Sequence, residues 1–231
     1  MNLLHNFDFG AIAIQFAVLL FSLSIHEASH AWMADRFGDH TARDQGRITI
    51  NPIAHIDPIG TVLFPLLQFF TNFPLIGWAK PVPTDPLQLR NPRRDQIFIS
   101  LAGPASNLLA GCTAFVLLVI LKVSWSEARG FIEFMTSIGR IPGNGSVLAP
   151  VLGILYYAMI INLLLAIFNF IPIPPLDGHW ILYGLLPASA AATLERIGSY
   201  GFIILYALML MGAFGFILMP VRLVIGILRL F

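Results

Sequence analysis

The sequence AIAIQFAVLLFSLSIHEASHAWMA, residues 11–34, decides the fold. A helix needs roughly 20 mostly apolar residues to cross the hydrocarbon core of a bilayer, and this segment meets that requirement. Its ionisable residues, His26, Glu27 and His30, gather near its carboxyl end. The segment therefore predicts a membrane-spanning helix with polar chemistry close to one face of the membrane.

Further apolar segments follow along the chain. Segments of similar length and composition occupy residues 97–121, 148–170 and 200–219. Residues 59–78 are also apolar, but glycines and prolines interrupt them, which favours a short span or a re-entrant loop. We expect an all-α polytopic membrane protein with about 4–6 transmembrane helices.

The composition supports an integral membrane protein. Hydrophobic residues make up 57% of the 231 residues and charged residues only 11%, whereas a soluble domain carries about 25% charged residues. The formal net charge of +1 argues against a nucleic-acid partner and leaves the lipid bilayer as the expected surroundings. The single cysteine, Cys112, excludes an intramolecular disulfide and a cysteine-based metal site.

Two short stretches between the first and second long spans have strand-like patterns. Residues 47–50 alternate polar and apolar side chains. Val82 stands between Pro81 and Pro83, and proline is tolerated in edge strands. We therefore expect a short re-entrant β-like segment in this part of the chain.

The basic residues predict how the chain is oriented, because segments rich in Lys and Arg stay in the cytoplasm. Seven of the 13 lysines and arginines lie between residues 34 and 96: Arg36, Arg43, Arg47, Lys80, Arg90, Arg93 and Arg94. The first span should therefore run from the outside to the cytoplasm, with its carboxyl end on the cytoplasmic side.

The motif HEASH, residues 26–30, has the spacing of a metal site. Histidines four residues apart on a helix point the same way, so His26 and His30 can bind one zinc ion. Glu27 lies where it can take a proton from a water molecule on that zinc. Ionisable residues in a membrane span are costly and indicate function, which outweighs a chance match.

A catalytic zinc site uses three protein ligands, so a third is needed. Asp177 stands in NFIPIPPLDG, residues 169–178, where three prolines break the helix. Such a break at membrane depth is tolerated against protein or a watery cavity. Asp-Gly is also a common turn pair, but beside a two-histidine half-site the carboxylate is the better candidate for a ligand.

Three motifs in this order, HEASH at 26–30, GPASN at 103–107 and N…LDG at 169–178, resemble the site-2 protease family of intramembrane metalloproteases. The resemblance covers roughly residues 11–180. It implies a single membrane-embedded metalloprotease domain over residues 1–231, similar to the compact prokaryotic members without a PDZ or CBS domain. It also implies a place in the prokaryotic inner membrane, with the active site towards the cytoplasmic face.

The resemblance further implies the roles of individual residues. One zinc ion would be held by His26, His30 and Asp177, with Glu27 as the catalytic base. The substrate would be a transmembrane protein or peptide, hydrolysed within or next to its membrane-spanning segment in regulated intramembrane proteolysis.

Two asparagines and one further histidine are additional candidates. The family pattern favours Asn107 and Asn169 as residues of the catalytic cleft that serve the substrate or the oxyanion. Asn169 in particular would hold the substrate backbone or the developing oxyanion. His179, which follows Asp177-Gly178, is either an outer partner of the ligands or a rival ligand. His55 and Asp57 are more typical of a turn than of a metal site.

Three other functions are consistent with parts of the sequence. A membrane metal transporter would use intramembrane His and Asp but would not need Glu27 beside them. A non-catalytic membrane-protein-binding homologue would be expected to lose Glu27 or a ligand. A prenyl-protein protease also carries this motif in a membrane, but it would need a later Glu as third ligand, and Glu195 is poorly placed for that role.

Overall fold

The structure is a computed structural model that describes residues 9–71, 77–142 and 146–231. Within these ranges the chain is helical and forms no β-strand, which confirms the all-α class. Three helices are long and apolar enough to cross a membrane: α1 (Phe9–Arg36), α4 (Pro92–Ser124) and α6 (Leu148–Asn169). The bent pair α8 (Ala188–Gly198) and α9 (Gly201–Leu210) gives a fourth span if it is counted as one.

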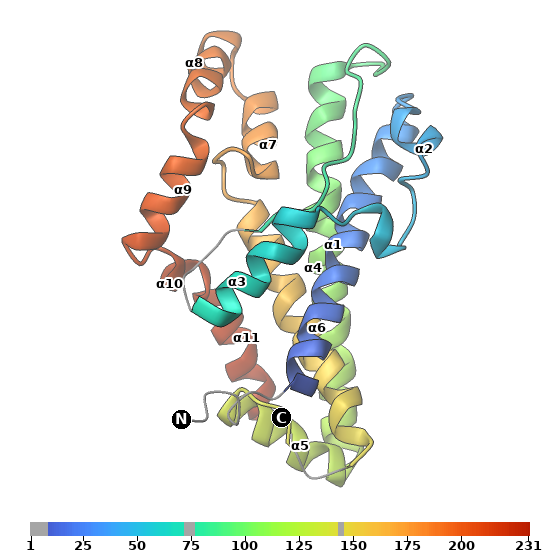
Figure 1. Cartoon of the computed structure of the whole chain (residues 1–231), viewed down its shortest axis with the longest axis vertical. Helices are drawn as coiled ribbons and strands as arrows, with labels where there is room; N and C mark the ends of the chain where they lie inside the picture. The colour runs from blue at the N-terminus through green and yellow to red at the C-terminus, as the bar shows by residue number, and fades with distance from the viewer. Residues whose placement is uncertain (1–8, 72–76, 143–145) are drawn as a thin grey trace.

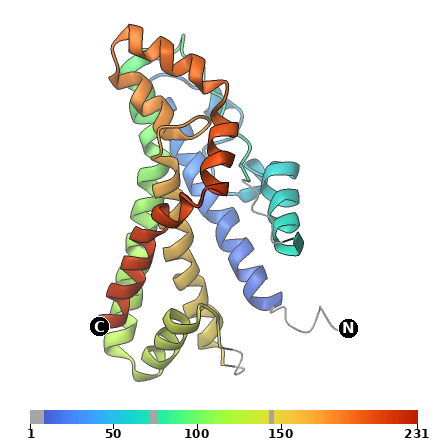
Figure 2. The ribbon, with the colours of Figure 1, turned by 90° about the vertical axis from the view of Figure 1, so that its left-hand side faces the viewer.

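The central helix is α4, which packs along both α1 and α6 (Figure 1). Buried small residues, Gly103, Gly111 and Ala114, lie on its packed face. In lipid there is no hydrophobic drive between helices, so small residues that let backbones approach closely favour association. The amino end of α1 and the carboxyl end of the chain lie at the same end of the molecule (Figure 2).

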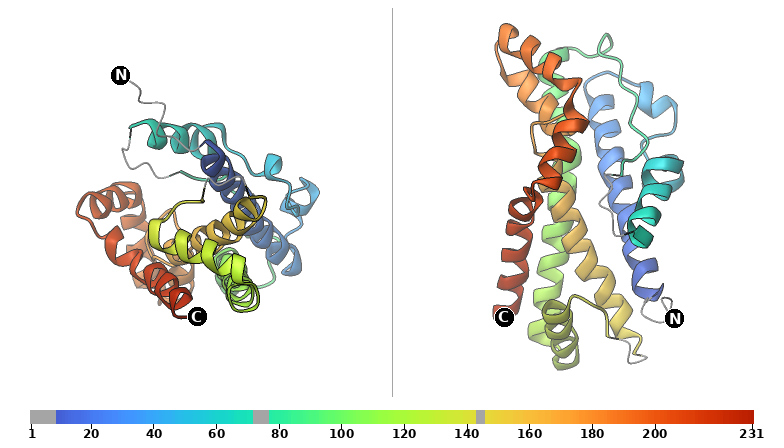
Figure 3. Two further views of the ribbon diagram at one scale, coloured as in Figure 1. Left: turned by 90° about the horizontal axis from the view of Figure 1, so that it is seen from below. Right: turned by 60° about the vertical axis from the view of Figure 1, so that its left-hand side comes forward.

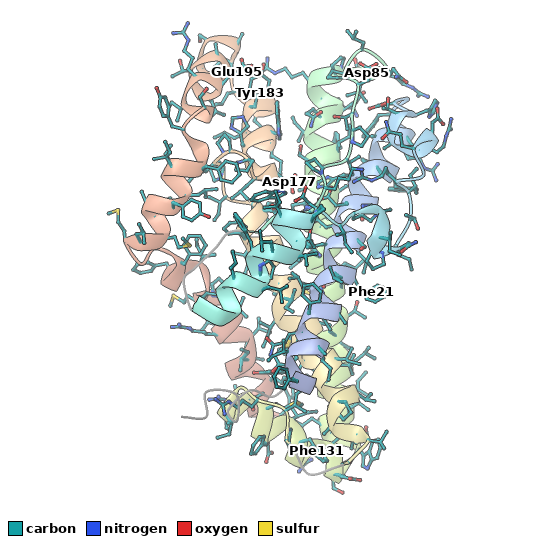
Figure 4. The ribbon with its side chains drawn as sticks, in the orientation of Figure 1. Phe21, Asp85, Phe131, Asp177, Tyr183 and Glu195 are labelled. Atoms are coloured by element: carbon teal, nitrogen blue, oxygen red, sulfur yellow. The ribbon has the colours of Figure 1, made fainter. Side chains whose placement is uncertain are left out.

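The main apolar core lies at that same end of the molecule, where α5 (Ser126–Ile138) folds across the ends of α4 and α6. Phe131 marks this end in Figure 4. Ile132 and Met135 from α5 pack with Leu152 from α6, and all three are fully buried. The last helix, α11 (Met219–Leu230), joins this core and accepts two 3.1 Å hydrogen bonds from the Lys122 ammonium at its final carbonyls.

The connection between α1 and α4 begins and ends at one place. The Arg90 N–H donates to the Phe37 carbonyl at 3.4 Å, and the Asp85 N–H donates to the Asp39 carboxylate at 2.7 Å. The connection includes α2 (Thr41–Asp44), the 3-10 helix η2 (Pro52–Ala54), the π-helix η3 (Pro58–Leu63) and α3 (Phe64–Thr71). Its two ends therefore lie on the same side of any membrane that the long helices cross.

The apolar segment at 59–78 also returns to its starting point. The Trp78 N–H donates to the Gly60 carbonyl at 3.3 Å, and the Thr61 hydroxyl donates to the Trp78 carbonyl at 2.8 Å. Helices η3 and α3 follow one another without a break, and the apolar helix Pro58–Gln68 rises about 16 Å, which is still short of a bilayer core. Residues 72–76 lie outside the described part of the chain. The structure therefore favours the re-entrant form over a single crossing.

The expected strands at 47–50 and 80–83 do not form in the described residues. Pro81 and Pro83 have no N–H to donate, which weakens any ladder between the two stretches. A side chain connects them instead, because the Arg47 guanidinium donates to the Lys80 carbonyl at 2.5 Å. The β-like part of the prediction is wrong, and the two stretches are irregular chain.

The single helix expected at 200–219 is also wrong. Helix α9 ends at Leu210, and Gly212 adopts φ +79°, a left-handed conformation that glycine tolerates best. A short α10 (Phe214–Ile217) follows, and Pro220 then stands in the first turn of α11, where its missing N–H costs nothing. Figure 3 shows α9, α10 and α11 following one another down the length of the molecule.

Candidate metal centre

Helix α1 places two imidazoles side by side. His26 and His30 are only 5% and 8% exposed, and their Nε2 atoms lie 3.0 Å apart. The four-residue spacing puts both on one face of the helix, as the sequence predicts. Two ring nitrogens thus meet inside the helix bundle.

The opposite ring nitrogens fix the tautomers. The His30 Nδ1–H donates to the Ile99 carbonyl at 2.6 Å, and a carbonyl can only accept. The His26 Nδ1–H donates to the Asn107 side-chain oxygen, also at 2.6 Å. In the neutral imidazoles both Nε2 atoms therefore carry lone pairs, and those lone pairs face each other.

Asp177 completes the cluster from the first turn of α7 (Asp177–Leu185). Its carboxylate oxygens lie 3.0 Å from His26 Nε2 and 3.3 Å from His30 Nε2. The buried Oδ2 atom receives no hydrogen bond from any residue that the structure describes. In Figure 4 Asp177 lies below Tyr183 and Glu195 and far from Phe131, so the cluster is nearer to the end that carries the α1–α4 connection.

The three residues fit a zinc ion. One ligand atom from each of His26, His30 and Asp177 lies within 4.8 Å of the others. Two imidazole nitrogens and one carboxylate oxygen are a usual donor set for catalytic zinc, which keeps a fourth position open. Buried acceptors that face one another without a proton between them are unfavourable until a cation joins them.

Gly103 provides the room for this cluster. A Cβ atom at this position of α4 would collide with the imidazole of His30 and come within 2.7 Å of His26 Cε1. The glycine of the GPASN motif therefore lets α4 pass directly behind the two histidines. This agrees with close helix packing and adds a specific reason for it.

Asn107 supports His26 through a buried network. Its amide nitrogen donates to the Ser22 carbonyl at 3.1 Å and to the Asn162 side-chain oxygen at 2.8 Å. Asn162 in turn donates to the Ser22 hydroxyl at 2.8 Å. Asn107 is fully buried with both amide protons in use, so its geometry suits orientation of His26 and leaves no donor for an oxyanion.

Glu27 lies on the next face of α1 and is half-buried. Two buried side chains of the α1–α4 connection interact electrostatically with its carboxylate, Arg47 and His55. Burial lowers the pKa of Arg47, and the Glu27 charge opposes that shift. Burial also lowers the pKa of His55, whose Nε2–H donates to the Thr49 carbonyl at 2.8 Å. Arg47 Nε and His55 Nδ1 have no hydrogen-bond partner among the described residues.

The remaining candidates take other positions. Asn169 is half-buried at the end of α6, and its amide donates to the Leu165 carbonyl one turn earlier at 2.9 Å. The His179 ring packs against Trp180 and Tyr183 and does not join the ligand group found in the described part of the chain. Asp57 accepts hydrogen bonds from the N–H groups of Ile59 and Gly60, which confirms its turn role.

Sequence reasoning missed four contributors to the site. The Ile99 carbonyl has no side-chain signal, and Ser22 looks like an ordinary small residue of a span. From the sequence, Asn162 would be expected only to hydrogen-bond a neighbouring helix. In the structure its side-chain oxygen accepts a hydrogen bond from Asn107 and so belongs to the network that supports His26. Arg47 appears in the sequence as a basic loop residue at the start of the strand-like stretch 47–50, although it is 4% exposed.

Comparisons with known proteins agree with this geometry. The model of peptidase family M50 matches residues 14–212. "Putative zinc metalloprotease YwhC" of Bacillus subtilis is 35% identical over 87% of this chain and 82% of its own length. "Putative zinc metalloprotease Rip2" of Mycolicibacterium smegmatis is 31% identical over 87% of this chain and 68% of its own length. No solved structure matches the chain significantly.

A helical membrane protein with this cluster, and with these similarities, is by class a membrane zinc metalloprotease. The chain belongs to peptidase family M50, the site-2 protease family, which confirms the resemblance drawn from its three motifs.

Proposed function

We propose that the protein is an intramembrane zinc endopeptidase that cuts other membrane proteins within or next to their transmembrane segments, as in regulated intramembrane proteolysis. The depth of the candidate metal centre carries this proposal. His26 and His30 precede the end of α1 at Arg36 by about 15 Å and 9 Å along the helix axis. Both depths fall inside a bilayer core about 30 Å thick.

The residues divide the work of hydrolysis between them. His26, His30 and Asp177 would hold one zinc ion, which when bound polarises the scissile carbonyl and lowers the pKa of water towards about 7. Glu27 takes the proton from the attacking water and later delivers it to the leaving amine. Asn107 and Ile99 keep the two imidazoles in the tautomer that presents Nε2 to the metal.

Asn169 is proposed for the substrate side of the reaction. A helical substrate hides its peptide bonds, so its chain must unwind before Glu27 can act on it. Asn169 ends α6 just before the proline-rich turn that leads to Asp177. One amide proton is used within α6, and the second is available to hold the substrate backbone or the developing oxyanion.

We place the site on the cytoplasmic side of a prokaryotic inner membrane. The α1–α4 connection and the helix ends that flank it carry seven of the 13 lysines and arginines, and the two ends of the connection meet at the end of the molecule nearer to Asp177. Segments rich in Lys and Arg remain cytoplasmic. Water can reach a site at this depth without crossing the whole bilayer.

The proposal is tested with Glu27→Gln, which removes the base and keeps the ligands. We expect this variant to retain zinc and to lose cleavage of a model transmembrane substrate in detergent by 100-fold or more, roughly the range of general-base catalysis. Glu127→Gln, at an exposed carboxylate of α5, is the control and should cleave at the normal rate. Normal cleavage by Glu27→Gln would refute the proposed mechanism.

A further inference from the structure

A groove with a cavity of about 820 Å³ separates the start of α4 from the end of α7. From α4 it is lined by Arg93, Arg94 and Ile97, and from the α7–α8 turn by residues 184–187. This is the end of the molecule where the α1–α4 connection closes, at the top of Figure 1. The groove is separate from the candidate metal centre, which lies at the other end of α7.

The groove carries the positive charge of two arginines. The Arg93 Nε–H donates to the Gly184 carbonyl at 3.2 Å, and the Arg94 guanidinium lies 5.7 Å from the centre of the Phe98 ring. Neither arginine forms an ion pair with any residue in the described ranges. The adjacent Asp95 is 2% exposed and already accepts a 2.7 Å hydrogen bond from the Asn91 N–H.

The groove also has an apolar half. Leu185 is 69% exposed, and Leu186, Pro187 and Ile97 complete the lining. The polar residues 92–96 stand immediately before the apolar run of α4, so Arg93 and Arg94 lie at the level of lipid head groups. An anion that is joined to hydrocarbon would satisfy both halves of this groove at once.

We propose that this groove binds the head group of an anionic phospholipid, with its phosphate between Arg93 and Arg94, its glycerol region against Leu185 and its acyl chains continuing past Ile97 into the bilayer. Basic pockets between transmembrane helices on the cytoplasmic side suit such head groups. A free phosphate would use the arginines alone and would leave the exposed apolar half uncovered.

The test measures which lipid the purified protein retains. Protein in mixed micelles with equal amounts of phosphatidylglycerol and phosphatidylcholine is analysed by native mass spectrometry, and wild type should retain phosphatidylglycerol preferentially. The double variant Arg93→Gln, Arg94→Gln should lose about 5-fold in that preference for each arginine, or about 25-fold together. An unchanged helical circular dichroism spectrum shows that the variant is folded.

Arg36→Gln is the matched control. Arg36 ends α1 at the same end of the molecule, and its guanidinium lies 5.1 Å from the Trp32 ring, outside the groove. This variant should keep the wild-type preference. An equal loss in Arg36→Gln, or no loss in the double variant, would overturn the proposal. Complete displacement of the lipid by inorganic phosphate would assign the site to a soluble phosphate and would also overturn it.

Discussion

Two hydrogen bonds to Nδ1 atoms determine what the histidines of α1 present to each other. Because Ile99 and Asn107 accept these protons, neither imidazole can rotate without leaving a buried polar group unpaired, at a cost of about 1–3 kcal/mol. The rings are therefore held in a metal-binding orientation by α4. Their Nε2 atoms and the Asp177 carboxylate are arranged for the ion without rearrangement of α1.

The assignment of Asp177 as the third ligand is tested by its removal. Asp177→Ala should weaken zinc binding by more than about 100-fold, since loss of even an outer partner costs 10–100-fold. Zinc content is measured after equilibration with a competing chelator. Asp57→Ala and Glu195→Ala should keep wild-type zinc, because Asp57 caps η3 and the ligand group does not include Glu195. Zinc loss in either control, with retention in Asp177→Ala, would show that the ligand assignment is wrong.

Asn107 provides a test of orientation against direct action on the substrate. Asn107→Leu removes the acceptor for His26 Nδ1–H, so zinc affinity should fall by about 10–100-fold. Ser106→Ala is the control, because the Ser106 hydroxyl donates its hydrogen bond to the Gly103 carbonyl of its own helix. If Asn107→Leu bound zinc as tightly as wild type and lost only turnover, the oxyanion role expected from the sequence would be correct instead.

At the scale of the helices, the metal centre depends on how closely α1 and α4 approach. Gly103 is the contact point, since any side chain there meets both imidazoles. The Asn107 network ties the same two helices together one turn further along α4. A single position on α4 thus controls both helix packing and the space available to the ligands.

Gly103→Ala should therefore lower zinc affinity and the thermal stability of the protein together. The added methyl group overlaps the His30 ring, and overpacking of this kind costs about 1–3 kcal/mol. Gly130→Ala is the matched control, because a Cβ atom at this exposed position of α5 meets nothing within 4 Å. That control should be neutral or slightly stabilising in a thermal unfolding assay. Equal behaviour of the two variants would refute the steric role of Gly103.

The elements themselves were predictable where apolar length decides them. The three long spans follow from their composition. Helix α6 ends one residue before its predicted limit, whereas α1 and α4 exceed theirs by a few residues because polar turns such as residues 92–96 extend the helix beyond the lipid. The prediction of a single last span was wrong, because a count of apolar residues does not detect the left-handed conformation of Gly212 or the start of a new helix at Pro220. The prediction of strands at 47–50 and 80–83 was wrong because a strand must pair with a partner that has N–H groups to donate, and Pro81 and Pro83 have none.

For the whole molecule, the ligand set requires that α1 and α7 meet at one membrane depth. This holds if residues 37–91 cross the bilayer an even number of times, and the Phe37–Arg90 hydrogen bond supports that. The ligands His26, His30 and Asp177 could be proposed from sequence motifs, because each motif contains side chains that can bind a metal ion. The hydrogen-bond network around these ligands could not be predicted, because it depends on how α1, α4 and α6 are aligned with one another. The sequence of one segment alone does not determine that alignment.

This topology is tested by cysteine labelling. The Gln88 amide donates to the Thr41 hydroxyl at 3.1 Å, so single cysteines at these positions in a Cys112→Ala background should react with an impermeant reagent from the same side. That side should be cytoplasmic: labelled in inverted vesicles and protected in intact cells. Ser126→Cys, at the exposed start of α5, is the control and should label from the other side. Labelling of Thr41 and Gln88 from opposite sides would refute the shared depth of the ligands.

The position of the histidines near the carboxyl end of α1 also affects how the chain is inserted into the membrane. The leading part of α1, up to Ile25, is mostly apolar, and the ionisable side chains follow it. A charged side chain at the centre of a bilayer costs about 2.5–3.5 kcal/mol during insertion. In the proposed orientation the amino end crosses first, so Glu27 never has to enter the far leaflet. The metal can then be loaded after insertion, from the compartment in which the chain was synthesised.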